Sequence, residues 1–119
     1  MYTLTVNNNY IHNIEASNGV TISKNKKHTF NDRGSLVLRI PGMADMNFID
    51  LADKKLPGYP QPKETWGVLV RYSNMEAYYR YEGSGTLNAT FDTLGTCSLT
   101  TSNGSMLPIS IREFVIETN

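Results

Sequence analysis

The sequence predicts an all-β protein: a single antiparallel β-sandwich or jelly-roll-like domain of about eight or nine short strands over residues 1–119. Three observations predict this class. Apolar and polar residues alternate along most of the chain, and turn-forming residues interrupt this alternation about every 10 to 12 residues. No segment shows the apolar period of a helix of convincing length. A chain of 119 residues accommodates one domain of ordinary size.

In the first half, three segments carry the two-residue period. Residues 2–6 read as a half-buried strand, with Tyr2, Leu4 and Val6 on one face. Residues 14–22 predict a β-hairpin, because Asn18-Gly19 suits a type I′ turn in which both central residues have positive φ. Residues 36–40 alternate as a further strand, which ends at Pro41-Gly42.

The middle of the chain allows two interpretations. Residues 43–56 fit a short helix capped by Asp45, but the run Asn47-Phe48-Ile49 equally fits a strand. Residues 54–63 predict a loop, because its three prolines donate no backbone hydrogen bond and favour an extended backbone.

The second half alternates more regularly. Turn signals separate its apolar runs at Ser73-Asn74, at residues 83–85, at residues 92–95 and at residues 102–104. Strands are therefore predicted at residues 66–72, 75–81, 86–91 and 96–100, followed by two apolar runs at 109–111 and 114–116.

Charge and the N-terminal residues exclude several function classes. Eleven basic and eleven acidic residues cancel, so no overall field points to a nucleic acid or an anionic membrane as partner. The N-terminus lacks the basic and apolar regions of a signal peptide, and the apolar runs are far shorter than the ~20 residues that span a bilayer. We expect a soluble chain, without membrane insertion, that is made in a cytoplasm.

Candidate reactive residues are few. Cys97 is the single cysteine, so neither an intrachain disulfide nor a thiolate metal site is predicted, and its strand-like surroundings indicate a buried thiol. His12 and His28 are interpreted as surface residues. No cofactor motif occurs.

A calcium site is not predicted, because no calcium loop has the spacing of Asp45, Asp50 and Asp53.

The residue spacing also argues against an enzyme. Glu76 and Glu82 would lie ~20 Å apart on one strand, whereas paired glycosidase carboxylates lie ~5–10 Å apart. A hydrolase whose catalytic residues come from several loops is the enzyme alternative that sequence spacing leaves open.

Aromatic residues concentrate between residues 59 and 81, mixed with two arginines. Tyr78 and Tyr79 must point to opposite faces of a strand, so the cluster cannot all lie in one core. Two interpretations follow: Trp66, Tyr72, Tyr79 and Tyr81 pack the sandwich while Tyr78 stays singly on the surface, or exposed rings and arginines form a recognition surface for sugars or proteins. For the second, the candidate binding residues are Tyr59, Trp66, Arg71, Tyr78 and Arg80.

One segment resembles a known class of domain. The run ETWGVLVRY at residues 64–72, preceded by LPGYP at 56–60 and followed by the aromatic-rich residues 75–81, resembles segments of tailed-phage fibre and receptor-binding domains. The resemblance covers about 25 residues and transfers no binding residue. It implies a small β module displayed on a virion, as a homo-oligomer and most simply a trimer.

These observations lead to one functional hypothesis and one alternative. The hypothesis is a non-enzymatic phage virion accessory protein (capsid decoration, head fibre or tail receptor-binding part). It would contact itself or other virion proteins, with an unpaired strand edge docking a neighbour, and a host surface glycan. The alternative is a small lectin-like sandwich that binds carbohydrate or lipid, similar in size to aegerolysin-type proteins, although those concentrate tryptophan and this chain has one, Trp66.

Overall fold

The computed structural model describes residues 2–31, 35–51, 66–73, 75–81, 85–101 and 106–113, with the backbone alone for Tyr2, Trp66, Tyr81 and residues 106–113. These residues form strands and no helix, which confirms the predicted all-β class. Eleven strands occur in the described ranges: β1 (Tyr2–Asn8), β2 (Ile14–Ala16), β3 (Thr21–Ile22), β4 (Lys26–Phe30), β5 (Leu36–Arg39), β6 (Met46–Asp50), β7 (Trp66–Tyr72), β8 (Met75–Tyr81), β9 (Gly85–Phe91), β10 (Cys97–Thr101) and β11 (Met106–Glu113).

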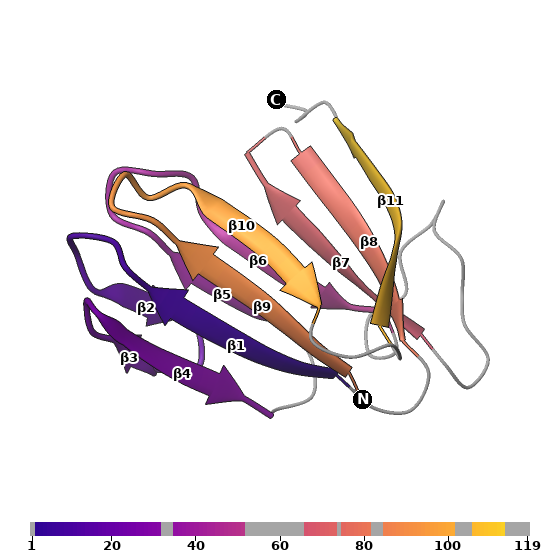
Figure 1. Cartoon of the computed structure of the whole chain (residues 1–119), viewed down its shortest axis with the longest axis horizontal. Helices are drawn as coiled ribbons and strands as arrows, with labels where there is room; N and C mark the ends of the chain where they lie inside the picture. Colours follow the sequence, from indigo (N-terminus) through magenta and orange to yellow (C-terminus); the bar gives the residue numbers. More distant parts are fainter. Residues whose placement is uncertain are drawn as a thin grey trace.

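The strands form two sheets that face each other (Figure 1). One sheet has four strands in the order β10-β9-β1-β4, and the other has seven in the order β11-β8-β7-β6-β5-β2-β3. All pairs but one are antiparallel; β1 runs parallel to β9, with Tyr2 opposite Gly85 and Asn8 opposite Phe91. The predicted sandwich is therefore correct, but it is not wholly antiparallel.

One local prediction needs correction, and one choice that the sequence left open is decided. The predicted hairpin at residues 14–22 forms from β2 and β3, but its turn is not type I′, because Gly19 has φ +93° whereas Asn18 is not among the residues with positive φ. The Gly19 N–H donates to the Ala16 carbonyl, and the Val20 carbonyl accepts from the Ala16 N–H, which are the bonds of a three-residue loop with glycine at its left-handed position. In residues 43–56, the strand interpretation is correct for β6, and the helix interpretation is wrong there.

Strand β4 was not predicted from the sequence. Its residues Lys26–Phe30 carry one strongly apolar side chain, so the local pattern resembles a polar loop. It forms because it pairs along its whole length with β1, from Leu4 opposite Phe30 to Asn8 opposite Lys26. The predicted loop at residues 54–63 lies outside the described residues.

The core lies between the sheets and is built from the inward side chains of both. Leu4 and Val6 are buried as the alternation predicts, as is Tyr79 on β8. Other buried members of this cluster include Ile14, Leu38, Met46, Phe48, Val68, Val70, Leu87, Ala89 and Phe91.

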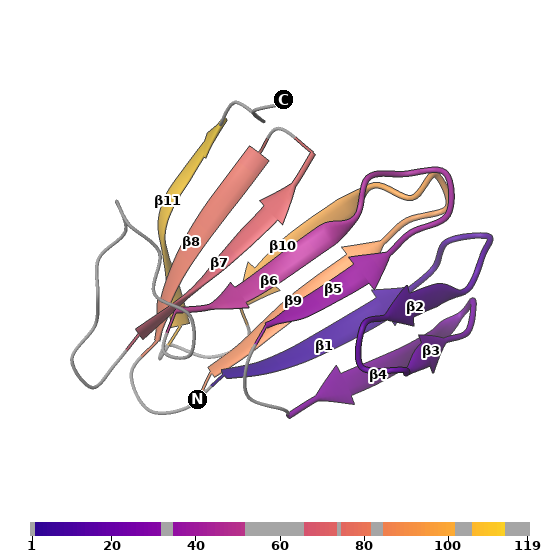
Figure 2. The ribbon, with the colours of Figure 1, turned by 180° about the vertical axis from the view of Figure 1, so that it is seen from behind.

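The two sides of the sandwich differ. At one side, residues 23–25 link β3 of the large sheet directly to β4 of the small sheet. At the other side, β7, β8 and β11 extend beyond β10, as both views of the ribbon show (Figures 1 and 2). The small sheet therefore covers one part of the large sheet, and β10 is its last strand where the coverage ends.

Candidate functional site

Three of the five predicted binding residues share one face. Arg71 on β7, with Tyr78 and Arg80 on β8, lie on the outer face of the seven-stranded sheet, because their neighbours Val70 and Tyr79 point into the core. Trp66 begins β7 opposite Tyr81, and Tyr59 lies outside the described residues.

Tyr78 is buried, not exposed. Its exposed fraction is 6%, and it packs with Leu69, Leu51 and Ile49 in a second apolar cluster outside the main core. The ring lies over Gly67: a Cβ atom on this glycine would come within 2.5–2.6 Å of the ring atoms. The expectation that Tyr78 stays on the surface is therefore wrong. Gly67, on the neighbouring strand β7, has no side chain and so leaves room for the ring.

Arg71 is held by an acidic neighbour. Its Nε donates to the Glu76 Oε2 at 3.1 Å, across the register pair that joins β7 and β8. The Arg71 side chain is 34% exposed and that of Glu76 is 2% exposed. This geometry gives Arg71 a structural role in satisfying a buried carboxylate.

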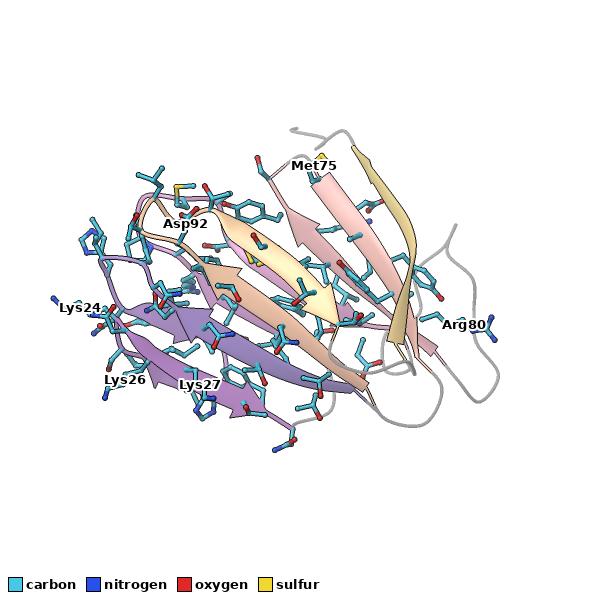
Figure 3. The ribbon with its side chains drawn as sticks, in the orientation of Figure 1. Lys24, Lys26, Lys27, Met75, Arg80 and Asp92 are labelled. Atoms are coloured by element: carbon cyan, nitrogen blue, oxygen red, sulfur yellow. The ribbon has the colours of Figure 1, made fainter. Side chains whose placement is uncertain are left out.

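Arg80 remains exposed and points away from the sheets (Figure 3). Of the three predicted residues on this face, one aromatic ring is thus buried and one arginine is paired. Among the described side chains of this segment, Tyr78 and Tyr79 are buried and Tyr72 is half-buried. The side chains of Tyr59, Trp66 and Tyr81 lie outside the described ones, so the recognition surface stays a prediction.

The edge strand β10 is a stronger candidate. Its inward residues Cys97, Leu99 and Thr101 are half-buried, whereas the inward residues of the adjacent strand β9 are completely buried. Within the described residues β10 pairs with β9 alone, so its other backbone edge faces the side where β7 and β8 continue.

A pocket of about 350 Å³ lies beneath this edge, between β10 and the seven-stranded sheet. Such a volume falls in the range of ordinary ligand pockets, roughly 300–1,000 Å³. Met75, at the start of β8 (Figure 3), is one of its lining residues and is 36% exposed. The pocket is lined mainly by apolar side chains and three that carry sulfur: Met46, Val70, Tyr72, Met75, Glu76, Ala77, Tyr79, Cys97 and Leu99.

Burial shifts the pKa values of the thiol and the phenols that line this pocket. It raises the pKa of the Cys97 thiol from 9.0 to about 12, with a smaller contribution from the Asp92 carboxylate. It likewise raises the pKa of the Tyr72 and Tyr79 phenols, and Cys97 raises both further. The thiol and both phenols are therefore neutral near pH 7. The Glu76 carboxylate belongs to the opposite face of the strand, where it pairs with Arg71.

We expect Cys97 to react slowly with iodoacetamide. A pKa of about 12 reduces the thiolate fraction at pH 8 by about 1,000-fold relative to a thiol of pKa 9.0, and the greater nucleophilicity of the more basic thiolate offsets part of this loss. The net alkylation rate should be about 50-fold below that of free cysteine. A rate in the native protein equal to the rate in denaturant would contradict the shielding of the thiol in its half-buried position.

The same shift predicts a dependence of stability on pH. Because folding raises the pKa of Cys97, the protonated thiol contributes fully to stability below pH 9, and this contribution falls as the pH rises toward 12.

Sequence reasoning identified these residues but not the site. Tyr72 and Tyr79 belong to the aromatic group at residues 59–81, and Cys97 was expected as a buried thiol on a strand. Their meeting point depends on β10 being a sheet edge, and the sequence carries no signal for that.

Comparison of the chain with protein-family models, curated proteins and solved structures finds no match. Among the described residues, no group of three or more His, Cys, Asp or Glu side chains could hold a metal ion. The same residues contain no helix with the length and apolarity needed to cross a bilayer.

Proposed function

We propose that this protein is a non-enzymatic structural and binding module that joins a neighbouring subunit by strand addition at β10. The observation that carries the proposal is the position of β10 above the apolar pocket, at the edge of the sheet that the described strands form. In strand addition, backbone hydrogen bonds supply affinity, and pockets for alternate side chains supply specificity.

The arrangement of the sheets supports this mode of contact. A strand added to β10 would lie about 4.8 Å from it and about 10 Å above the large sheet. It would therefore cover β7 and β8, which extend beyond β10 in Figures 1 and 2. Every second side chain of the added strand would point toward the pocket. The lining of this pocket is mainly apolar and its thiol and phenols are uncharged, so an apolar side chain is the favoured occupant.

The two groups best placed for chemistry support a binding role over catalysis. The Cys97 thiol is protonated near neutral pH, which makes it a poor nucleophile, and the Glu76 carboxylate is paired with Arg71. The resemblance of residues 64–72 to phage fibre domains supports placing such a module on a virion, as a homo-oligomer or beside other virion proteins. The proposed role is therefore that of a phage virion accessory protein.

Light scattering coupled to size-exclusion chromatography tests the strand addition. We expect the wild-type chain to be an oligomer at micromolar concentration, and Leu99→Lys to shift it to monomer, because an inward-pointing charge on an edge strand opposes pairing. Thr100→Lys, one residue further on β10 and on the outer face, introduces the same charge and should leave the oligomer intact.

Circular dichroism and thermal unfolding of both variants establish that Leu99→Lys remains folded. A wild-type chain that is strictly monomeric at micromolar concentration would contradict the homo-oligomer. Equal dissociation of the two lysine variants would contradict the assignment of the contact to the inner face of β10.

A further inference from the structure

The outer face of the four-stranded sheet is almost entirely uncharged and polar. Its outward positions are occupied by threonine, asparagine and serine, with one lysine, whereas exposed sheet faces commonly carry charges of both signs. The strand registers align these residues in rows across the sheet. One row contains Thr29, Thr5, Asn88 and Thr100, and the next contains Lys27, Asn7, Thr90 and Ser98.

Hydrogen bonds between neighbouring strands hold several of these side chains in place. The hydroxyl oxygens of Thr5 and Thr29 lie 3.0 Å apart, and the Asn7 Nδ2 donates to the Thr90 Oγ1 at 3.4 Å. The face therefore presents an ordered set of hydroxyl and amide groups to solvent.

A hollow of about 480 Å³ lies where β1 and β9 end and β4 begins. Backbone bonds fix its rim: the Asn9 N–H donates to the Phe91 carbonyl at 2.9 Å, and the Asn25 N–H to the Asn8 carbonyl at 2.6 Å. Asn25 itself has φ 62°, a left-handed conformation that asparagine tolerates. The lining residues are Asn7, Asn9, Asn25, Lys26, Lys27 and Thr90.

The charged side chains that line this hollow have one sign. Lys26 and Lys27 line it, and Lys24 stands beside them at the same corner, each pointing into solvent (Figure 3). None of the three forms an ion pair with the described residues. The Asp92 carboxylate instead accepts bonds from Leu94 and Thr96 within its own turn.

We propose that this hollow binds an acidic carbohydrate, that is, a sugar unit carrying a carboxylate or sulfate group. The ammonium groups of Lys26 and Lys27 would bind the anionic group, and the asparagine amides and the threonine hydroxyl would bind the sugar hydroxyls. The polar rows would extend the contact along a chain of sugars. The hollow is on the opposite face of the sheet from the pocket beneath β10, so this proposal is independent of strand addition.

The chemistry of the face favours a carbohydrate over a single-stranded nucleic acid. Binding of unpaired bases uses aromatic side chains as stacking surfaces. The described outward positions of this sheet carry hydroxyl, amide and ammonium groups instead of aromatic rings.

Titration calorimetry at physiological salt, with the full chain, tests the proposal. The probes are oligogalacturonate for the carboxylate, dextran sulfate for the sulfate, dextran as the neutral polymer and oligo(dT) as the nucleic acid. We expect binding of one or both acidic probes, about 10-fold weakening by Lys27→Gln and about 5-fold weakening by Thr90→Val, which removes a hydroxyl without changing charge or β-branching.

The matched control is Lys24→Gln, which removes the same charge from a residue that does not line the hollow and should change the affinity less than about 2-fold. Equal weakening by Lys24→Gln and Lys27→Gln, or no effect of Thr90→Val, would overturn the site in favour of nonspecific attraction. Binding of dextran or oligo(dT) as tight as that of the acidic sugars, or no binding of either acidic probe at millimolar concentration, would overturn the ligand class. Thermal unfolding confirms that each variant is folded.

Discussion

Replacing Asn8 with alanine is expected to lower the free energy of unfolding by about 3 kcal/mol, since each of its three hydrogen bonds contributes about 1 kcal/mol. The side chain is completely buried at the end of β1. Its Nδ2 donates to the carbonyls of His12 at 3.0 Å and Ile22 at 2.9 Å, and its Oδ1 accepts from the Tyr10 N–H at 2.9 Å. These bonds connect the end of β1 to the loop before β2 and to the end of β3.

Urea denaturation followed by circular dichroism measures this effect. Asn8→Asp tests the direction of the bonds, because aspartate keeps the acceptor for Tyr10 and loses both donors. Asn9→Ala is the matched control: Asn9 is exposed, its backbone bond to Phe91 is retained, and the expected change is below about 0.5 kcal/mol. A loss below about 1 kcal/mol for Asn8→Ala would show that the three bonds do not stabilise the fold as argued.

Gly67→Ala is expected to destabilise the protein by about 2 kcal/mol, as overpacking does in a well-packed site. The new Cβ would lie 2.5 Å from the Tyr78 ring, so the ring must leave its position against Leu69 and Leu51. Gly67→Val should have a larger effect because its side chain fills more of the space under the ring.

A double-mutant cycle with Tyr78→Leu isolates this contact. In the Tyr78→Leu background the clash is removed, so Gly67→Ala should cost about 1–2 kcal/mol less than in the wild type. Additive effects of the two substitutions would contradict the packing of the tyrosine ring on the glycine.

Local alternation was sufficient to predict most of the strands. In β7 and β8 it also predicted that Tyr78 and Tyr79 occupy opposite faces, which is correct. It failed for β4, where Lys26, His28 and Phe30 do not form an apolar face. It failed also for the exposure of Tyr78, because the gap that receives the ring is created by Gly67, which lies eleven positions earlier in the chain. Gly67 becomes a diagonal neighbour of Tyr78 only when β7 and β8 pair, with Gly67 opposite Arg80 and Leu69 opposite Tyr78.

The candidate sites were less predictable than the strands. The five predicted binding residues all come from one aromatic-rich segment, residues 59–81. The hollow proposed to bind an acidic sugar instead combines residues of β1, β4 and β9, and the pocket beneath β10 combines residues of β6, β7, β8 and β10. Threonine and asparagine repeat along β1 and β9, but nothing in either repeat indicates that the two strands are neighbours. Their parallel pairing joins residues more than 80 positions apart.

The sequence by itself determined the all-β class, the positions of most strands and which side chains within each of those strands share a face. These properties depend on residues i and i+2, which lie on one side of any extended chain. The tertiary structure alone decided which strands are edges, that β1 and β9 run parallel, and which outward residues meet on one surface. Those properties depend on pairing between distant segments, whose free energy is the sum of many small contacts that no local pattern records.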